Sequence, residues 1–538
     1  MARVVALAVL VAFAATAFVL VRWAGEQAAL AVAAERLAAG DPAAAERQLA
    51  LRAGARARAG RALSRALSGA GREAEGCACA PEDLAYFRPR LLVEEAIRRG
   101  DPTGAVRVAR LARETGDPAA GVALAAALVE AGSDGEARAA LSSVPAWDRD
   151  KGLGREVARV LDLRGAGAAC IVRDRGRRLA GTLDASGSFH VVPGAEAYVP
   201  PAAAEALAGA ARAPGLRLAV DFELSRLARD ALGGYRGSVV LLGLPGGDVL
   251  TAVSDARTTA EGGTPAFEQR REPASIAKIV TAAAALRAGI DPDAEIARMT
   301  CEGFARYEGG ALWCVSPGGK LSGLAHALAI SCNVAFANLG MKVGPAALVE
   351  EFRRWGFDGG REAGRILQAP EGGLPLAKMA VGLDATDITP LHAARLAAVA
   401  AAGEMPEPAL VAATDGALGL SPRTLPRPPA RTVLDPPAAA LLHRSMEAVT
   451  QPGGTAEGVA PAAFPVAMKT GTASTPGQGY HVNYVGVGPL PHLTIAFCVR
   501  VTGQPTSAHV TRAAREVLSN LLQGLAGKSF AGGPSFAD

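Results

Sequence analysis

The hydrophobic pattern begins with a long uncharged stretch near the start of the chain. Val4–Val21 contains eighteen residues and no charged side chain. A helix of that length extends about 27 Å, which is enough to cross a bilayer once. Arg3 precedes the stretch and Arg22 follows it, and this slight charge asymmetry favours an N-terminus in the cytoplasm. The alternative is a cleaved signal peptide, since small residues cluster near Ala15–Ala17. Under both interpretations, the rest of the chain is exported.

The next stretch, from Ala24 to about Arg164, has helical apolar spacing and is rich in Ala, Arg and Glu. Its turns carry a recurring Gly-Asp-Pro at Gly40–Pro42, Gly100–Pro102 and Gly116–Pro118. Glycine can end a helix, aspartate can cap the next helix, and proline suits the first helical position. The spacing of these turns resembles that of tetratricopeptide-type helical hairpins. We therefore expect a helical region that either binds a protein partner or acts as a spacer.

Short apolar runs bounded by turns replace this helical pattern from about Ala168 onward. Two of them flank Pro245-Gly246-Gly247-Asp248 and predict a β-hairpin over 237–254, after a helix over 223–232. Further runs at 482–487 and 493–501 predict an antiparallel meander.

Composition and charge narrow the classes of function. Half of the residues are hydrophobic but only 4% are aromatic, so closely packed alanine-rich helices are expected. A chain of 538 residues is too long for one core, which predicts about two to four domains. The net charge of +4 creates too weak a field to indicate nucleic-acid binding. The seven histidines and seven cysteines show no metal-type spacing, so no metal site is expected.

The first candidate for catalysis is the pair Ser275 and Lys278. The pair lies in Arg271–Lys278, just ahead of an apolar run, and reads as the first turn of a buried helix. Positions i and i+3 share a helix face, so the Lys278 amine can lie beside the Ser275 hydroxyl. A desolvated amine can take the proton of a serine and make it a nucleophile. By itself the pair is a weak signal, because a helix with a surface lysine has the same spacing.

Two later motifs would complete a site around this pair. Ser331-Cys332-Asn333 ends a helical run and places a hydroxyl and an amide on one loop. Lys469-Thr470-Gly471, followed by Thr472, lies on a predicted strand. A lysine and threonine hydroxyls suit a substrate carboxylate, and the small Gly471 would let a substrate backbone lie against the strand edge.

In this order, Ser275-x-x-Lys278, Ser331-x-Asn333 and Lys469-Thr470-Gly471 resemble the three signatures of the penicillin-binding protein and serine β-lactamase superfamily. The flanking Glu272-Pro273-Ala274 and His481-Val482-Asn483 are similar to those of the transpeptidases in particular. The resemblance covers roughly 165–524 and includes no glycosyltransferase signature, so it is closest to the monofunctional, class B-like members. It implies an α+β transpeptidase domain with an antiparallel sheet flanked by helices.

The resemblance implies a role for each catalytic side chain. Ser275 would attack the carbonyl of a D-alanyl-D-alanine stem peptide, and Lys278 would take its proton. Ser331 would relay a proton to the leaving amine, while Lys469 would help to orient Ser331. The backbone N–H groups of Ser275 and Thr472 would form the oxyanion hole.

The other motif residues would bind the substrate. Asn333 would hold the substrate amide, and Thr470 and Thr472, on the strand with Gly471, would bind the terminal carboxylate. No metal or organic cofactor is implied. The implied partners are peptidoglycan stem peptides, β-lactam antibiotics, the membrane through the N-terminal helix, and a cell-wall protein for the helical region.

Three alternatives share the same nucleophile or the same fold. A D,D-carboxypeptidase differs only in whether water or an amine removes the acyl group. A β-lactamase is less well supported, because the chain contains neither an E-x-x-L-N loop nor a Tyr-Gly-Asn string. A membrane-anchored scaffold with an idle transpeptidase domain would need neither Ser275 nor Lys278, and all three motifs are intact.

Two departures from the family pattern concern the cleft. Met468 stands where a small residue, often glycine, is common before Lys-Thr-Gly. Leu383-Asp384 follows Ala380-Val381-Gly382 where Gln-Gly is frequent. We expect both departures to narrow or reshape the cleft without changing the chemistry.

Cysteine placement predicts one disulfide. Cys301 and Cys314 bracket a short loop before the second motif, and a bridge closing it in an exported chain would contribute about 3 kcal/mol in the chain-entropy model. The alternative is a pair of thiols. Cys332 is expected to serve packing, and Cys170 and Cys498 are expected to be buried in strands.

The predicted organisation has five parts. They are a transmembrane anchor or signal segment at 1–23, a helical repeat-like region at 24–164, a small β-containing pedestal at 165–215, a transpeptidase domain at 216–527 and a tail at 528–538. The expected location is a bacterial inner membrane crossed once, with the catalytic domain in the periplasm or outside the cell.

Overall fold

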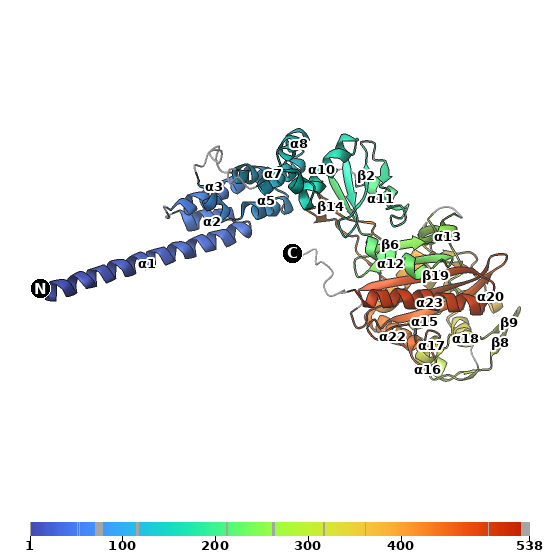
Figure 1. Ribbon diagram of the computed structural model, residues 1–538. Coiled ribbons are helices and arrows are strands. Elements are labelled where there is room, and N and C mark those ends of the chain that lie inside the picture. Colours follow the sequence, from blue (N-terminus) through green and yellow to red (C-terminus); the bar gives the residue numbers. More distant parts are fainter. Residues whose placement is uncertain are drawn as a thin grey trace.

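The structure is a computed structural model that describes residues 2–50, 52, 54–69, 79–113, 118–210, 213–260, 264–315, 318–360, 362–492 and 494–528, with the backbone alone for 2–15, 118 and 260. Figure 1 shows an elongated molecule in which a long N-terminal helix leads into a helical region, then a small sheet, and finally a large lobe. The predicted tail at 528–538, except Lys528, and the Gly116-Asp117 turn lie outside the described residues.

The N-terminal helix α1 (Ala2–Ala38) is continuous over 37 residues. Its part from Thr16 is the one described helix that is long and apolar enough, by length and composition, to cross a membrane. Phe18, Leu20 and Trp23 are 58–68% exposed, whereas the later Leu30 and Leu37 are buried in the helical core. Figure 1 shows the helix projecting from the protein at its N-terminal end. It exposes apolar side chains around Phe18–Trp23 and is packed into the helical core from Leu30 onward.

The helical region is built from short helices joined by tight turns. They are α2 (Pro42–Leu49), α3 (Ala55–Ser68), α4 (Pro81–Ala85), α5 (Pro89–Arg98), α6 (Pro102–Arg113), α7 (Pro118–Glu130), α8 (Asp134–Ser142), α9 (Ala146–Arg149) and α10 (Gly152–Gly165). Neighbours in sequence, such as α2 and α3 or α6 and α7, pack against each other around one core of Ala, Val and Leu. The tetratricopeptide likeness stays a prediction, since helix order and packing alone do not define that repeat.

The Gly-Asp-Pro turns act as predicted where they are described. Gly40 and Gly100 have φ of +67° and +75°, the left-handed region that glycine occupies without strain. The Asp41 carboxylate accepts a hydrogen bond from Ala44 N–H at 2.9 Å, and Asp101 accepts one from Gly104 N–H at 2.8 Å. Each such cap stabilises its helix by about 1 kcal/mol.

A six-stranded sheet follows the helical region. Its strands are β1 (Cys170–Arg173), β2 (Leu179–Leu183), β3 (Phe189–Val191), β4 (Gly215–Leu218), β14 (Val411–Asp415) and β15 (Arg423–Thr424), in the order β15-β14-β4-β1-β2-β3, with α11 (Ala203–Ala208) between β3 and β4 in the chain. Strands β1 and β4 are parallel, and the other pairs are antiparallel. The predicted boundary at 215/216 falls inside β4, and the chain returns to this sheet at 411–424 because β14 pairs with β4. The predicted pedestal is thus completed by strands from the part of the chain that was assigned to the next predicted domain, 216–527.

The helical region is joined to this sheet through Glu130, at the end of α7. Its carboxylate accepts hydrogen bonds from the backbone N–H groups of Ala417 and Leu418, at 2.9 and 2.8 Å. Both residues are at most 1% exposed and belong to the core of the helical region. The loop after β14 is therefore capped by a side chain from a distant part of the sequence.

Replacing Glu130 by alanine is expected to lower the free energy of unfolding of this junction by about 1–3 kcal/mol, because two buried N–H groups lose their acceptors. Guanidinium unfolding of the detergent-solubilised full chain measures this change. The matched control is Glu136→Ala on α8, where the carboxylate is exposed and pairs with Arg110 on the surface; it should shift stability by less than about 0.5 kcal/mol. Equal effects of the two substitutions would contradict the capping role.

The large lobe is centred on a five-stranded antiparallel sheet. Its strands are β17 (Ala467–Thr475), β18 (Gly479–Gly488), β19 (Ile495–Gln504), β5 (Gly237–Gly243) and β6 (Asp248–Ser254), in that order across the sheet. The predicted hairpin over 237–254 is β5–β6, and the predicted meander is β17–β18–β19. Every residue of β19 from Ile495 to Thr502 is buried, so helices cover both faces of the sheet. The predicted α+β class is confirmed.

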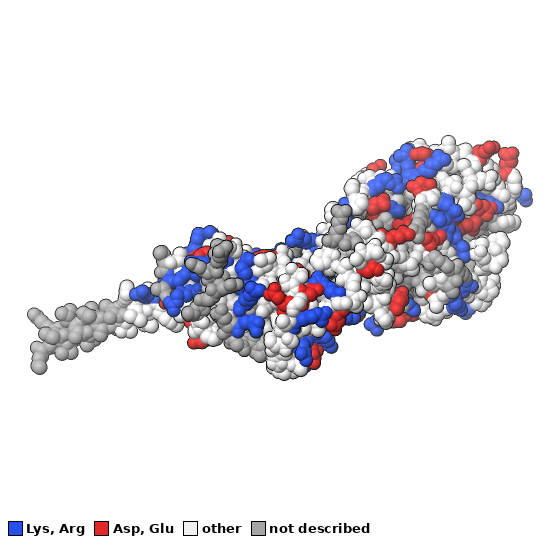
Figure 2. Space-filling view, turned by 90° about the horizontal axis from the view of Figure 1, so that it is seen from above, with Lys and Arg blue, Asp and Glu red and all other residues white. Residues whose placement is uncertain are grey.

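Helices surround this sheet and form the lower half of the lobe in Figure 1. Those in contact with the sheet are α12 (Phe222–Leu232), α14 (Pro265–Glu268), α21 (Pro390–Ala402), α22 (Pro436–Glu447) and α23 (Ser507–Ala526). Those beyond them are α15 (Ala277–Arg287), α16 (Pro292–Ala297), α17 (Leu324–Ala329), α18 (Asn333–Val343), α19 (Pro345–Arg354) and α20 (Gly373–Ala380). The predicted helix over 223–232 is α12. On the face shown in Figure 2, acidic and basic side chains are interspersed over the lobe.

Small strand pairs complete the lobe. They are β7 (Thr300–Cys301) with β10 (Gly319–Lys320), β8 (Phe304–Tyr307) with β9 (Gly310–Trp313), β11 (Arg365–Ile366) with β12 (Thr386–Asp387), and β13 (Glu404–Met405) with β16 (Arg431–Thr432). The β8–β9 hairpin lies beside α18 and α20 at the rim of the lobe.

Candidate active site

Ser275 lies on a short turn at the start of a buried helix. The turn is a 3₁₀ helix (η2, Ala274–Ile276) that runs directly into α15. Ser275 was expected in the first turn of the α-helix, but the α-helix begins at Ala277 and Ser275 lies in the 3₁₀ turn before it. Ala274 has φ of +50°, a conformation that costs a non-glycine residue about 1 kcal/mol or more. The hydrogen bond from Ala274 N–H to the Gly382 carbonyl, at 3.0 Å, holds this turn in place. Ser275 remains partly exposed while Lys278 is fully buried.

The Lys278 amine connects the first two motifs. Nζ donates to Ser275 Oγ at 3.0 Å, to Ser331 Oγ at 3.1 Å and to Asn333 Oδ1 at 2.7 Å. It also donates to the Ser331 carbonyl at 2.6 Å. The predicted neighbours Ser275 and Lys278 are therefore in contact, and Ser331 and Asn333 meet them from a distant segment.

The third motif reaches the same hydroxyl from the sheet. Lys469 Nζ, on β17, donates to Ser331 Oγ at 3.0 Å and to the Thr470 carbonyl at 2.8 Å. Ser331 itself has φ of +56°, a strained conformation for a serine. Its hydroxyl is thus held between the amines of Lys278 and Lys469.

Burial changes the proton affinity of both lysines. Desolvation lowers the pKa of Lys278 to about 7. Desolvation, together with the nearby Lys278, lowers the pKa of Lys469 well below its ordinary value. A neutral amine in contact with Ser275 Oγ can accept the serine proton, so the arrangement suits a base-activated nucleophile.

A cavity of about 450 Å³ opens over these groups. Ser275, Ser331, Asn333, Thr470 and Thr472 line it, so five of the predicted site residues face one space. The two lysines lie beneath this surface. The volume falls in the usual range for small-molecule sites.

Gly471 and Met468 have roles in the structure that differ from the predicted ones. An added Cβ at Gly471 would lie 2.6 Å from the Pro273 carbonyl oxygen, so the glycine lets β17 approach the chain's own backbone before Ser275 rather than making room for substrate. Met468 is 0% exposed in the core and does not reshape the cleft, because β17 turns its side chain inward. Leu383 does line the cavity, as expected for a departure that affects the cleft.

The segment before Ser275 is held by buried polar side chains from the sheet. The Glu272 carbonyl is contacted by His481 Nε2 at 3.0 Å and accepts a hydrogen bond from Asn483 Nδ2 at 3.2 Å. Arg500, fully buried, donates to Asn483 Oδ1 at 2.6 Å and to the carbonyls of Gln269 and Ile388. The polar residues of the His481-Val482-Asn483 stretch therefore hold the backbone just before Ser275 in place.

Thr455 and Tyr484 are among the cavity-lining residues that were not predicted from the sequence. Thr455 follows two glycines, and its Oγ1 lies 2.8 Å from Thr470 Oγ1. Arg515 on α23 donates to the Thr455 carbonyl at 3.2 Å and fixes this loop. Tyr484 on β18 faces the cavity with a buried hydroxyl. The string Gly453-Gly454-Thr455 is the sequence feature that could have indicated a loop carrying Thr455.

The predicted disulfide between Cys301 and Cys314 is not formed. Cys301 is a thiol, and Cys314 Sγ donates a hydrogen bond to Cys332 Sγ at 3.7 Å. The physical reason is that the Cys314 thiol contacts a third cysteine, Cys332, which was expected to serve packing alone. All three sulfurs lie within 4.8 Å of one another. Cys170 and Cys498 are buried in β1 and β19, as predicted.

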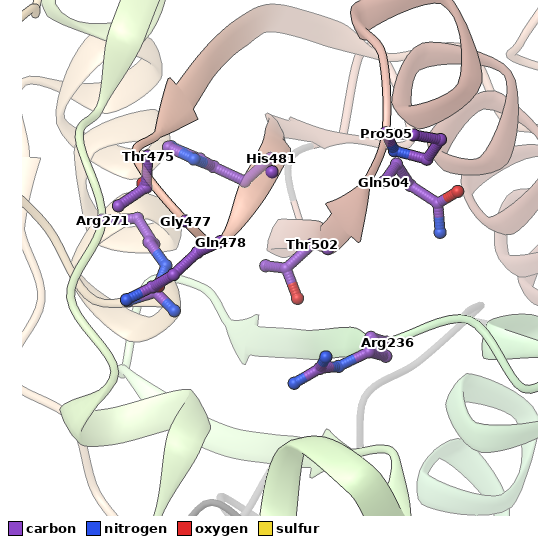
Figure 3. Close-up of a pocket in the computed structure, with 11 residues that line it drawn as sticks. Arg236, Arg271, Thr475, Gly477, Gln478, His481, Thr502, Gln504 and Pro505 are labelled. Atoms are coloured by element: carbon purple, nitrogen blue, oxygen red, sulfur yellow. The ribbon is translucent and has the colours of Figure 1, made fainter.

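A second pocket, of about 590 Å³, lies at the far end of β17 and β18 (Figure 3). Figure 3 shows Arg236 and Arg271 facing it from two sides, with Thr502 between them. Its described lining contains no residue of the three motifs. We therefore place the candidate active site in the smaller cavity, where the nucleophile and the two lysines meet.

Comparison with known proteins agrees with this geometry. A family model described as "Penicillin binding protein transpeptidase domain" matches residues 237–523, more than half of the chain. Peptidoglycan D,D-transpeptidase PbpA of Mycolicibacterium smegmatis is 30% identical over 270 residues, which cover 45% of this chain and 52% of that protein. The chain thus matches about half the length of this relative.

Solved structures share the fold at lower identity. PBPA of Mycobacterium tuberculosis has a TM-score of 0.54 and 20% identity, covering 67% of this chain and 99% of that one. PBP2 of Pseudomonas aeruginosa has a TM-score of 0.53 and 19% identity, covering 68% and 97%. From the match over 237–523, together with three motifs that meet in one cavity, we conclude that the chain belongs to the penicillin-binding protein transpeptidase family.

Proposed function

We propose that the chain is a serine-type peptidoglycan D,D-transpeptidase that forms an acyl-enzyme on Ser275. The observation that carries the proposal is the contact of one buried amine, Lys278 Nζ, with Ser275 Oγ at 3.0 Å and Ser331 Oγ at 3.1 Å. The name of the Mycolicibacterium relative supports the reaction, and a neighbouring structure at 20% identity is described as a ceftriaxone acyl-enzyme complex. β-Lactam antibiotics are therefore proposed to acylate the same serine.

The proposed first step makes an ester. Ser275 Oγ attacks the carbonyl carbon of the penultimate D-alanine, and its proton passes to the neutral Lys278 amine. The N–H groups of Ser275 and Thr472 are proposed to stabilise the oxyanion. The C–N bond then breaks, and the leaving D-alanine amine receives a proton through Ser331 Oγ, which Lys469 orients.

The proposed second step transfers the acyl group. An amine from a neighbouring stem peptide attacks the ester carbon, and its proton returns through Lys278 to Ser275 Oγ. The ester bond breaks, an amide cross-link forms, and the enzyme is restored without a metal or an organic cofactor. Thr470 and Thr472 are proposed to bind the terminal carboxylate of the donor, and Asn333 its amide.

The rest of the chain suits a tethered enzyme. We propose that α1 anchors it in a bacterial inner membrane, with the transpeptidase domain at 216–527 outside the cytoplasm. The exposed apolar side chains of Phe18, Leu20 and Trp23 support the anchor. The helical region at 24–164 and the pedestal at 165–215 then set the distance between membrane and active site, and the helical region is the proposed surface for a cell-wall partner.

The acylation rate should depend on pH through Lys278. Its pKa of about 7 means that the amine is charged, and cannot accept the Ser275 proton, at lower pH. We expect the second-order rate of acylation by a fluorescent penicillin to be constant above this pKa and to fall about tenfold per pH unit below it. Tryptophan fluorescence at each pH checks that the fold is intact. A rate that is flat between about pH 5 and pH 9 would contradict the role of Lys278 as the base.

Product analysis separates this function from its alternatives. The full chain is incubated with a stem pentapeptide, with and without an amine acceptor, and the products are identified by mass spectrometry. A transpeptidase gives a cross-linked product that requires the acceptor. Release of D-alanine without any cross-link identifies a carboxypeptidase, rapid turnover of penicillin identifies a β-lactamase, and the absence of all three reactions in folded protein identifies a scaffold.

A further inference from the structure

Three cysteine side chains converge directly behind the second motif. Cys301 comes from β7, Cys314 follows β9, and Cys332 is the residue between Ser331 and Asn333. Their sulfur atoms all lie within 4.8 Å of one another, and the Cys314–Cys332 distance is 3.7 Å. The chain has only seven cysteines, so three of them meet at one point from three separate segments.

Packing alone does not account for this cluster. Cys301 and Cys332 are 2% and 0% exposed, in a lobe whose other small core positions are filled mostly by alanine. Three soft donors in one place have a different chemical use, because thiolates are the preferred ligands of thiophilic cations such as Zn²⁺ and Cu⁺. Three sulfurs bound to one ion at about 2.3 Å lie about 4 Å apart, close to the spacing seen here.

The surroundings suit bound thiolates. The backbone N–H of Asn333 donates to Cys314 Sγ at 3.2 Å, the kind of outer hydrogen bond that supports metal-bound ligands. Cys332 is the N-cap residue of α18, an 11-residue helix, so it lies at the positive end of the helix dipole. An entry path exists on one side, where Cys314 is partly exposed and the next residue, Val315, is 97% exposed.

We propose that Cys301, Cys314 and Cys332 form a binding site for one thiophilic metal ion of the Zn²⁺ or Cu⁺ class. Each thiol loses its proton to solvent as its sulfur binds the ion. The ion ties the loop 301–314 to the segment that carries Ser331 and Asn333, in addition to the hydrogen bond from Asn333 Nδ2 to the Trp313 carbonyl at 2.8 Å. The role is structural, and the site is separate from the proposed acyl transfer.

Cobalt binding tests the site directly. The detergent-solubilised full chain is purified under reducing conditions and titrated with Co²⁺, whose thiolate complexes absorb light. We expect one Co²⁺ per chain, displaced by Zn²⁺, with the absorption lost in Cys301→Ser and Cys332→Ser. The matched control is Cys498→Ser, which removes an equally buried thiol in β19 and should bind Co²⁺ as the unaltered chain does.

A second measurement needs no variant. Iodoacetamide labelling followed by peptide mapping should show Cys314, the partly exposed thiol of the three, protected in the Zn²⁺-loaded chain and labelled after EDTA, with the buried Cys498 unlabelled in both. Reduced, folded protein that binds neither Co²⁺ nor Zn²⁺ would overturn the proposal, as would unchanged binding in Cys301→Ser. A disulfide among the three, with no metal uptake after its reduction, would overturn it as well. All of these outcomes are independent of penicillin or peptide turnover.

Discussion

Substitution of Ser275 by alanine is expected to abolish both covalent penicillin labelling and stem-peptide cross-linking, to the background of the assay. The substitution removes the oxygen atom that is proposed to form the ester, while the adjacent Lys278 amine keeps its contacts with Ser331 and Asn333. The measurement is in-gel fluorescence of the full chain after incubation with a fluorescent penicillin, together with product analysis by mass spectrometry.

The matched control for this substitution is Ser322→Ala, at an exposed serine in the loop before α17. It should label at the rate of the unaltered chain. Circular dichroism of both variants verifies that the fold is retained. Labelling of folded Ser275→Ala protein at more than a trace level would show that another nucleophile carries the reaction.

Replacing Lys278 by alanine is the second change with a large expected effect. Positioned general bases contribute about 10²–10⁴-fold to rates, so acylation should slow by that factor. The loss should be higher in that range because the same amine also contacts Ser331 Oγ, the proposed proton relay, at 3.1 Å. Stopped-flow or quenched-flow acylation by a fluorescent penicillin gives the rate.

Lys342→Ala serves as the control for the loss of a lysine. Lys342 lies on α18, but its amine pairs with Glu295 on the surface at 2.7 Å, and its side chain is 50% exposed. Its removal should leave the acylation rate unchanged. If Lys278→Ala protein that is folded were acylated within about tenfold of the normal rate, Lys469 or solvent would have to supply the base.

The sequence predicted the parts of the site that depend on residue type and local spacing. Ser275 and Lys278 were expected on one face of a helix, and their atoms are in contact. The hairpin over 237–254 and the meander after Lys469 were expected from alternating apolar runs, and both form. Capping chemistry likewise fixed the turns at Gly40 and Gly100.

Contacts between segments that are distant in the chain could not be predicted from the sequence. Nothing in the pattern indicated that Ser331 adopts φ of +56° or that its hydroxyl is held between two lysines 53 and 138 positions away. Likewise, Cys301 and Cys314 were paired because they bracket a loop. The Cys332 sulfur contacts Cys314 because of the way α18 packs, and a local sequence pattern does not predict that packing.

The division into parts was predictable only in outline. The change from helical to strand pattern near Ala168 marks the start of β1 to within two residues. The sequence did not indicate that residues 411–424 join the sheet that contains β1, because β14 and β15 are short and carry no motif. Strands recruited from afar are set by tertiary pairing, which a one-dimensional pattern does not contain.

The three motifs are proposed to form one site whose nucleophile is Ser275. The most direct test of this proposal is to trap the full chain with penicillin, digest it and locate the adduct by tandem mass spectrometry. We expect one adduct per chain, on Ser275, in the tryptic peptide that begins after Arg271 and ends at Lys278. An adduct on any other residue, or an unmodified Ser275 in folded protein at saturating penicillin, would contradict it.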